Sequence, residues 1–281
     1  MNDLVPKRYM TNTKLCVVIS DIHAGSTYAP VPDNFITLEG TVIVKNPVQK
    51  WIMKCWDDCW EWLYKTAGKD GWDIIINGDL VHGTLFRTKE IWSNNIDDHV
   101  MACYNLLKTP AQKAEHVYII QGTEAHVATY ENTIGNLLEG KGVKIVRQST
   151  ECSVWDSLLI KYNDILCKVD HHIATTGRPY LEASALSIHM GAERVEAARA
   201  KHAVPQVFAR AHRHKFGEFS DGYGTIFTSP PWIAKDRFAR KVVPHAIPQI
   251  GMVLMDFRGL EKGELPLIRT RLHTIKQQKI V

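Results

Sequence analysis

The chain has 281 residues, of which 45% are hydrophobic and 23% are charged. This composition is typical of a soluble globular protein and excludes a disordered one. No apolar stretch reaches the roughly 20 residues that span a bilayer, and the first eight residues lack the apolar core of a secretory signal. We therefore expect no membrane association and a cytoplasmic location. The net charge of +4 is compatible with a polyanionic partner but does not require one.

The first half of the chain alternates short apolar runs with helical patterns. Runs too short for a helix predict strands at residues 15–20, 73–77, 117–121 and 144–146. Helical patterns lie between them, at residues 47–65, 92–107 and 130–138. This β-α-β-α-β-α order predicts a layered α/β sheet.

The helix expected at residues 47–65 has one apolar stripe. Pro47 suits its first turn. The stripe repeats every three or four residues and consists of Ile52, Cys55, Trp56, Cys59, Trp60 and Leu63. Such spacing favours a helix packed on a sheet over an aromatic platform for a ligand.

The second half is richer in strands. A hairpin is expected around Tyr162-Asn163-Asp164, joining apolar runs at 158–160 and 165–169. A helix is expected at 181–202. Further strands are expected at residues 206–210, 224–228, 252–256 and 265–272. No linker divides the chain, so we expect one domain over residues 1–281, with a motif-bearing core at about 14–230 and C-terminal strands at about 250–273.

The six cysteines show no metal-binding or paired spacing. Since they lie among apolar neighbours, we interpret them as buried, reduced thiols.

Metal-ligand side chains follow several of the expected strands. Asp21 and His23 end the first run, and Gly78-Asp79 ends the second. Carboxylates and imidazoles suit Mn, Fe, Zn or Co. A carboxylate has two oxygens, so Asp79 could bridge two cations, with a turn or cap role as the alternative.

Two histidine pairs occur later. His212 and His214 are spaced so that both face the same side of an extended segment. His171 and His172 are neighbours, so only one of them should enter a site. We favour His171 and keep His172 as the alternative.

The order of these motifs resembles the calcineurin-like metallophosphoesterase superfamily, over about Lys14 to His214. Arg210-Ala211-His212-Arg213-His214 is similar to that family's closing Gly-His-x-His motif, with Ala211 in the glycine position. Gly78-Asp79-Leu80-Val81-His82 is similar to the second motif of the double-strand-break-repair nucleases.

The third motif departs from the family pattern, Gly-Asn-His-Asp/Glu. This chain has Gly122-Thr123-Glu124-Ala125-His126, which is similar to a variant in phage and prophage relatives. Either Glu124 supplies the missing ligand or Thr123 binds weakly in its place. His126 is the first candidate for assisting the leaving oxygen, and His82 is the second.

The resemblance implies a four-layer α/β/β/α sandwich with two divalent cations at its edge. Asp21, His23 and His214 would hold the first ion, and Asp79 would bridge. The second would be held by His171, His212 and either Glu124 or Thr123. A metal-bridging hydroxide would then attack the phosphate. Mn²⁺ is favoured, with Zn²⁺, Fe, Co²⁺ and Ni²⁺ as alternatives.

The expected activity is hydrolysis of phosphodiester bonds, with DNA or RNA as the favoured substrate. Basic residues at 235–241 and in the tail from Arg269 to Lys279 support that partner weakly. A small-molecule phosphodiesterase or phosphomonoesterase is the alternative. A non-catalytic scaffold of the same fold, as in the phosphoesterase-like retromer subunit, is a third reading.

Overall fold

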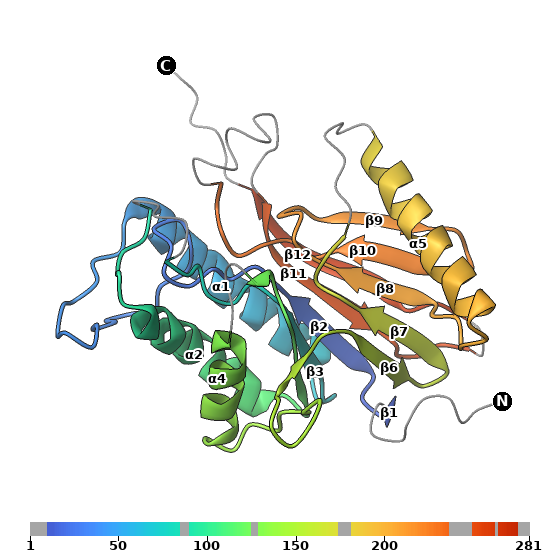
Figure 1. The fold of residues 1–281 in the computed structure, drawn as a ribbon, viewed down its shortest axis with the longest axis horizontal. Helices are drawn as coiled ribbons and strands as arrows, with labels where there is room; N and C mark the ends of the chain where they lie inside the picture. The colour runs from blue at the N-terminus through green and yellow to red at the C-terminus, as the bar shows by residue number, and fades with distance from the viewer. Residues whose placement is uncertain are drawn as a thin grey trace.

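Two six-stranded sheets face each other in the computed structural model of the chain (Figure 1). It describes residues 10–84, 90–124, 129–173, 181–235, 249–261 and 264–274. Within those ranges, no helix is long and apolar enough to cross a membrane.

The first sheet has the strand order β12-β11-β2-β3-β4-β5. Four neighbouring strands run parallel: β2 (Leu15–Ile19), β3 (Asp73–Asn77), β4 (Val117–Ile120) and β5 (Val154–Trp155). The other two are antiparallel additions at one edge: β11 (Gln249–Asp256) and β12 (Leu267–Thr274).

The second sheet has the order β1-β6-β7-β8-β10-β9. Its strands are β1 (Met10–Thr11), β6 (Leu158–Tyr162), β7 (Ile165–Val169), β8 (Val207–Arg210), β9 (Gly217–Ser220) and β10 (Thr225–Thr228). Strands β7, β8 and β10 are parallel, so their carboxyl ends share one edge. The expected hairpin is present as β6 and β7.

Helices cover the outer face of each sheet (Figure 1). The first sheet carries α1 (Pro47–Ala67), α2 (Ile96–Lys113) and α4 (Tyr130–Glu139). The second carries α5 (Glu182–Arg199), which buries Leu186 and Met190 against Phe208 and Ile226. The expected four-layer α/β/β/α sandwich is confirmed.

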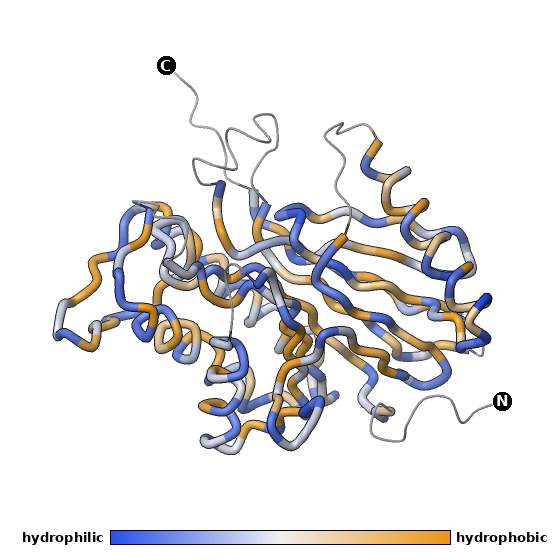
Figure 2. The backbone as a smooth tube through the Cα atoms, viewed as in Figure 1, coloured by the Kyte–Doolittle hydropathy of each residue, from blue (hydrophilic) through white to orange (hydrophobic). Residues whose placement is uncertain are grey.

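Side chains of β2 alternate between two hydrophobic cores, one on each face of the sheet. Leu15, Val17 and Ile19 pack toward the helices, whereas Cys16 and Val18 pack between the sheets. A strand buried on both faces has no polar positions, which explains its continuous apolar run. Apolar residues accordingly run along the strands at the centre of the molecule (Figure 2).

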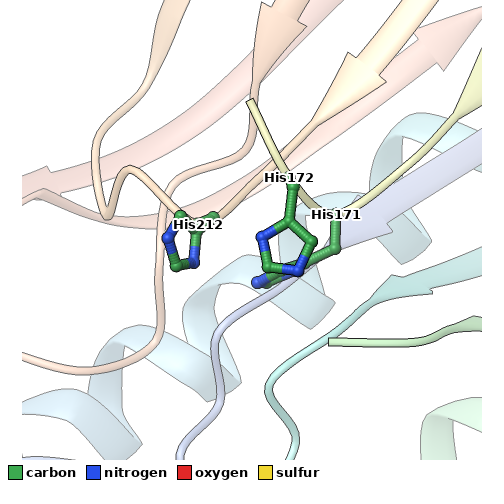
Figure 3. Close-up of side chains that lie close together, drawn as sticks. All are labelled: His171, His172 and His212. Carbon is green, nitrogen blue, oxygen red and sulfur yellow. The ribbon is translucent and has the colours of Figure 1, made fainter. Parts of the chain in front are cut away.

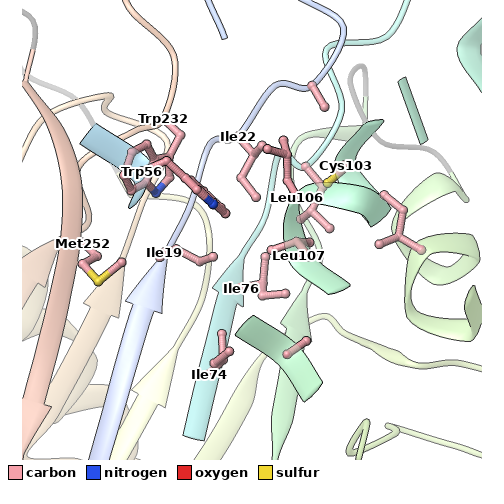
Figure 4. Packing of buried hydrophobic residues seen from close by; sticks show 14 of the residues in the cluster. Ile19, Ile22, Trp56, Ile74, Ile76, Cys103, Leu106, Leu107, Trp232 and Met252 are labelled. Atoms are coloured by element: carbon pink, nitrogen blue, oxygen red, sulfur yellow. The ribbon is translucent and has the colours of Figure 1, made fainter. Parts of the chain in front are cut away.

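Helix α1 begins and packs as its sequence predicts. Asn46 caps it, because its side chain accepts the N–H of Gln49 while the Gln49 side chain accepts the N–H of Asn46. All six residues of the stripe are buried. The Trp56 ring lies 4.6 Å from that of Trp232, in the layer that also holds Ile74 and Leu107 (Figure 4). The tryptophans therefore form core.

Several boundaries differ from expectation. Helix α2 begins at Ile96 because Asn95 caps it, and it continues through Pro110 to Lys113. The expected strand at 144–146 is reduced to one bridge between Ile145 and Val117. Strands β1, β5 and β9, of two, two and four residues, were not expected from the sequence. All six cysteines are free and five are buried, in line with the thiol interpretation.

Candidate metal centre

The candidate ligands lie in loops that follow parallel strands. Strands β2, β3 and β4 of the first sheet and β7 and β8 of the second each end in one such loop. In open α/β sheets, ligands bind outside the carboxyl ends of the strands. The two sheets therefore bring residues from five separated loops to a common edge.

One cluster contains Asp21, His23, Asp79 and His214, whose donor atoms lie within 4.8 Å of one another. The Nε2 atoms of His23 and His214 are 3.2 Å apart. Nε2 of His214 is also 3.2 Å from Oδ1 of Asp21. Two nitrogens bound tetrahedrally to one zinc ion would be about 3.3 Å apart. The spacing therefore suits a shared cation.

The backbone of these loops is strained. Eight non-glycine residues of the described chain have positive φ, and five are candidate ligands. They are Asp21, His23, Asp79, His212 and His214, with φ between 46° and 67°. A non-glycine residue in this region costs about 1–3 kcal/mol, and such residues cluster at functional sites. The orientation of these side chains therefore lowers the stability of the fold.

A second cluster contains three imidazoles, those of His171, His172 and His212 (Figure 3). Nδ1 of His171 is 2.7 Å from the carbonyl oxygen of Asn77. A carbonyl oxygen only accepts, so Nδ1 carries a proton and Nε2 is the nitrogen that could bind a metal. That Nε2 lies 3.2 Å from Oδ2 of Asp79, which places Asp79 between the two clusters.

Thr123 fixes both Asp79 and His212. Its backbone N–H donates to Oδ1 of Asp79 at 2.6 Å, and its hydroxyl donates to Oδ2 at 3.3 Å. The same hydroxyl is 3.2 Å from Nδ1 of His212. If it accepts that proton, Nε2 of His212 is left as the ligand atom. Glu124, the other candidate in this motif, has an exposed side chain.

Buried polar atoms at the site fit a cation. Both carboxylate oxygens of Asp21 are buried and accept no hydrogen bond from any described residue. Such a carboxylate is costly unless a positive charge compensates it. Burial lowers the pKa of His171, but the neighbouring carboxylate of Asp79 outweighs it and raises the pKa to about 9. The cluster thus attracts positive charge.

Known proteins give a limited comparison. No family model and no curated protein matches the chain. Among solved structures, an archaeal phosphodiesterase has a TM-score of 0.41 at 13% identity, covering 92% of this chain and 99% of its own. Vps29 from Entamoeba histolytica complexed with Zn²⁺ has a TM-score of 0.40 at 12% identity, and the match covers 92% of this chain and 98% of Vps29.

A putative 5'-nucleotidase from Staphylococcus aureus has a TM-score of 0.43 at 10% identity, and the match covers 95% of this chain and 55% of the nucleotidase. These values are too low to carry an activity across. The four layers and the order of the clustered side chains along the chain are those that the sequence motifs predicted. Both agree with the resemblance of those motifs to the calcineurin-like metallophosphoesterases.

The contacts of Thr123 lead to a prediction for the third motif. Thr123→Val should lower the affinity for divalent cations about 10- to 100-fold, the usual effect of removing a group that orients metal ligands. Glu124→Gln, the matched control one residue away, should bind them like the wild type. Metal titrations monitored by calorimetry measure both. A selective loss in Glu124→Gln would instead assign the ligand to Glu124.

Two glycines allow the loops to approach. A Cβ on Gly122 would lie 2.2 Å from the backbone nitrogen of Asp79. A Cβ on Gly78, whose φ is 78°, would lie 2.3 Å from Nδ1 of His171. Both contacts are impossible for any other residue, so the glycines are required by the packing of the ligand loops.

Glu131 is a site residue that the sequence did not reveal. It lies in the first turn of α4 and is buried. One carboxylate oxygen accepts the N–H of Gly122 at 2.9 Å, and the other accepts that of Leu80 at 3.4 Å. Burial raises the pKa of Glu131 to about 8. Its carboxyl group therefore ties together the two loops that carry Asp79 and Thr123.

Removing one acceptor of Glu131 should loosen both loops. At pH 9, above the pKa of Glu131, both of its oxygens accept; in Glu131→Gln the amide NH₂ would face a backbone N–H, leaving a buried donor unpaired at about 1–3 kcal/mol. We expect lower stability in urea and weaker cation binding. Glu139→Gln, on the same helix but at its exposed end, is the control. Unchanged stability and binding in Glu131→Gln would contradict this role.

Of the two candidates for assisting the leaving oxygen, only His82 lies within the described residues. His82 is buried, and its ring centroid is 5.6 Å from that of His23. It therefore lies against a candidate ligand. His126 lies outside the described residues.

Proposed function

We propose that the protein hydrolyses phosphodiester bonds with two divalent cations. The position of Asp79 is the observation that carries this proposal. Its Oδ2 atom is 3.7 Å from Nε2 of His23 in one cluster and 3.2 Å from Nε2 of His171 in the other. A carboxylate shared by two sets of donors is the arrangement needed for a pair of adjacent cations.

The side chains would hold the ions with little reorganisation. Asp21, His23 and His214 would hold the first, His171 and His212 the second, and Asp79 both. Thr123 and Asn77 hold Asp79 and His171 in place. Two cations so held would neutralise phosphate oxygens and lower the pKa of water. Mn²⁺ is the metal we favour, because carboxylates suit it and Asp21 and Asp79 both supply one.

The edge of the site is open to a substrate. The side chain of His214 is 35% exposed, and His172 is exposed. Arg213 stands between two candidate ligands in the sequence and forms no ion pair with a described residue. An arginine in this place suits a phosphate of the substrate. Together with the Gly-Asp-Leu-Val-His motif, it supports a nucleic acid as substrate.

Two arginines of the basic C-terminal segment are less available to a polyanionic substrate than the sequence implies. Arg271 donates two hydrogen bonds to Asp58, at 2.7 and 2.9 Å. Arg269 donates to Asp256 at 3.1 Å. These guanidinium groups are thus neutralised by carboxylates on the protein. Arg213 is a better candidate than either for contact with a polyanion.

The test compares substrates of one leaving group. We expect protein loaded with Mn²⁺ to hydrolyse bis-p-nitrophenyl phosphate faster than p-nitrophenyl phosphate, and to degrade single- or double-stranded DNA or RNA. Chelator-treated protein is the control. A preference for the monoester would favour the phosphatase alternative. Two bound ions without hydrolysis of any substrate would favour the scaffold.

A further inference from the structure

The two clusters supply different numbers of ligands. The first offers four side chains, namely Asp21, His23, Asp79 and His214. The second, as the sequence motifs define it, has only Asp79, His171 and His212. Three protein ligands and a water are enough for a catalytic zinc site, whereas a fourth side chain would make the second position as rich in ligands as the first. The residues around the second position show whether such a side chain is present.

Neither residue of the third motif meets this need. The hydroxyl of Thr123 is already engaged by Oδ2 of Asp79 and Nδ1 of His212. A neutral hydroxyl in that role orients the ligands more than it binds. The side chain of Glu124 is exposed and is not part of either cluster.

His172 is the nearest remaining donor. Its ring centroid lies 5.0 Å from that of His171 and 4.9 Å from that of His212. Each of the three rings offers a nitrogen within 4.8 Å of the other two. Figure 3 shows the rings gathered around one space, His171 and His172 from the chain after β7 and His212 from the chain after β8.

The backbone explains how two neighbours reach the same site. Strand β7 ends at Val169, and the chain bends at His171. The carbonyl of His171 accepts the N–H of Ala211, which keeps this bend beside the loop of His212. Side chains alternate only while the chain is extended. The expectation that only one of these histidines enters the site assumed an extended chain, which the bend at His171 does not provide.

We propose that His172 is a ligand of the second cation, completing a set of three imidazoles and the Asp79 carboxylate. This inference rests on the proposed function. The first centre has two carboxylates and two imidazoles, so the centres differ in softness. Imidazole-rich sites suit Zn²⁺, Co²⁺ and Ni²⁺, whereas carboxylate-rich sites suit Mn²⁺. The second centre should therefore prefer Co²⁺ over Mn²⁺ more strongly than the first.

The test is a titration of metal-free protein with Co²⁺, followed by calorimetry and by visible absorption, which reports the ligands of Co²⁺. We expect wild-type protein to bind two ions. His172→Ala should bind the first normally and the second at least about tenfold more weakly, with an altered spectrum. A parallel titration with Mn²⁺ should show a smaller loss. His202→Ala, which removes an exposed histidine elsewhere, is the matched control.

A second Co²⁺ ion bound equally well by His172→Ala would overturn the role of His172 and leave the proposed function intact. Slower hydrolysis with unchanged Co²⁺ binding would also overturn it, by assigning His172 to the substrate. Wild-type protein that binds no second ion would overturn the proposed function itself.

Discussion

Replacement of Asp79 by asparagine is expected to lower the rate of phosphodiester hydrolysis by about 100- to 1,000-fold, the size of loss seen when a group that stabilises developing charge is removed. An amide has one acceptor oxygen and no charge. Its NH₂ group would face either the N–H of Thr123 or Nε2 of His171, both now within 3.2 Å of the carboxylate. The measurement is kcat on bis-p-nitrophenyl phosphate with saturating metal.

Asp73→Asn is the matched control for this experiment. Asp73 is a buried aspartate at the opposite end of the same strand, β3. Its Oδ1 accepts the hydroxyl of Thr13 and its Oδ2 accepts that of Tyr162; in asparagine the oxygen keeps the first contact, and the NH₂ can donate to the tyrosine hydroxyl, which also accepts. Its variant should keep the wild-type rate. Retention of more than about a tenth of the activity by Asp79→Asn would contradict the bridging role.

Divalent cations are expected to raise the melting temperature by about 5–10 °C. A ligand at 100 times its Kd adds about 2.7 kcal/mol to stability, and 1 kcal/mol corresponds to about 2–4 °C in a protein of about this size. The physical reason is the burial of Asp21 and Asp79 in a cluster whose charges need a cation. Differential scanning calorimetry with Mn²⁺ and with chelator measures the shift.

The shift should be largely lost in Asp79→Asn, because both centres lose a shared charged ligand. It should persist in Asp73→Asn. An equal increase in melting temperature in both variants would mean that the cations stabilise the protein at some other place.

The fold could be predicted from the sequence where local patterns and burial agree. Ile74, Ile75 and Ile76 form a continuous apolar run because β3 is buried on both faces, and β-branched residues suit such a strand. The stripe of α1 repeats with the helical period because one side of that helix packs on the sheet. The candidate ligands follow strands, so their convergence was predictable from the parallel order.

Other features depend on tertiary contacts that no local pattern records. A glutamate in the first turn of a helix is common on protein surfaces, since it suits the helix dipole. Nothing near Glu131 in the sequence distinguishes that role from its buried contact with the loops of Gly122 and Leu80. The positive φ of five candidate ligands is equally hidden, because aspartate and histidine, although enriched at positive φ, adopt negative φ far more often.

The third motif shows the same limit. The sequence left Thr123 and Glu124 open as alternatives, because either side chain could turn inward. In the folded chain the approach of Gly122 to Asp79 places the N–H and hydroxyl of Thr123 against the carboxylate, a contact that no local pattern indicates. The bend after β7, which brings in His172, likewise follows from its pairing with the next loop.

Asp79 is expected to lie between two cations held by side chains from five loops. Anomalous diffraction from a crystal grown with Mn²⁺ tests this arrangement most directly. We expect two peaks about 3.5–4 Å apart, one beside His23 and His214 and the other beside His171 and His212. A single peak away from Asp79, or no peak among these side chains, would contradict it.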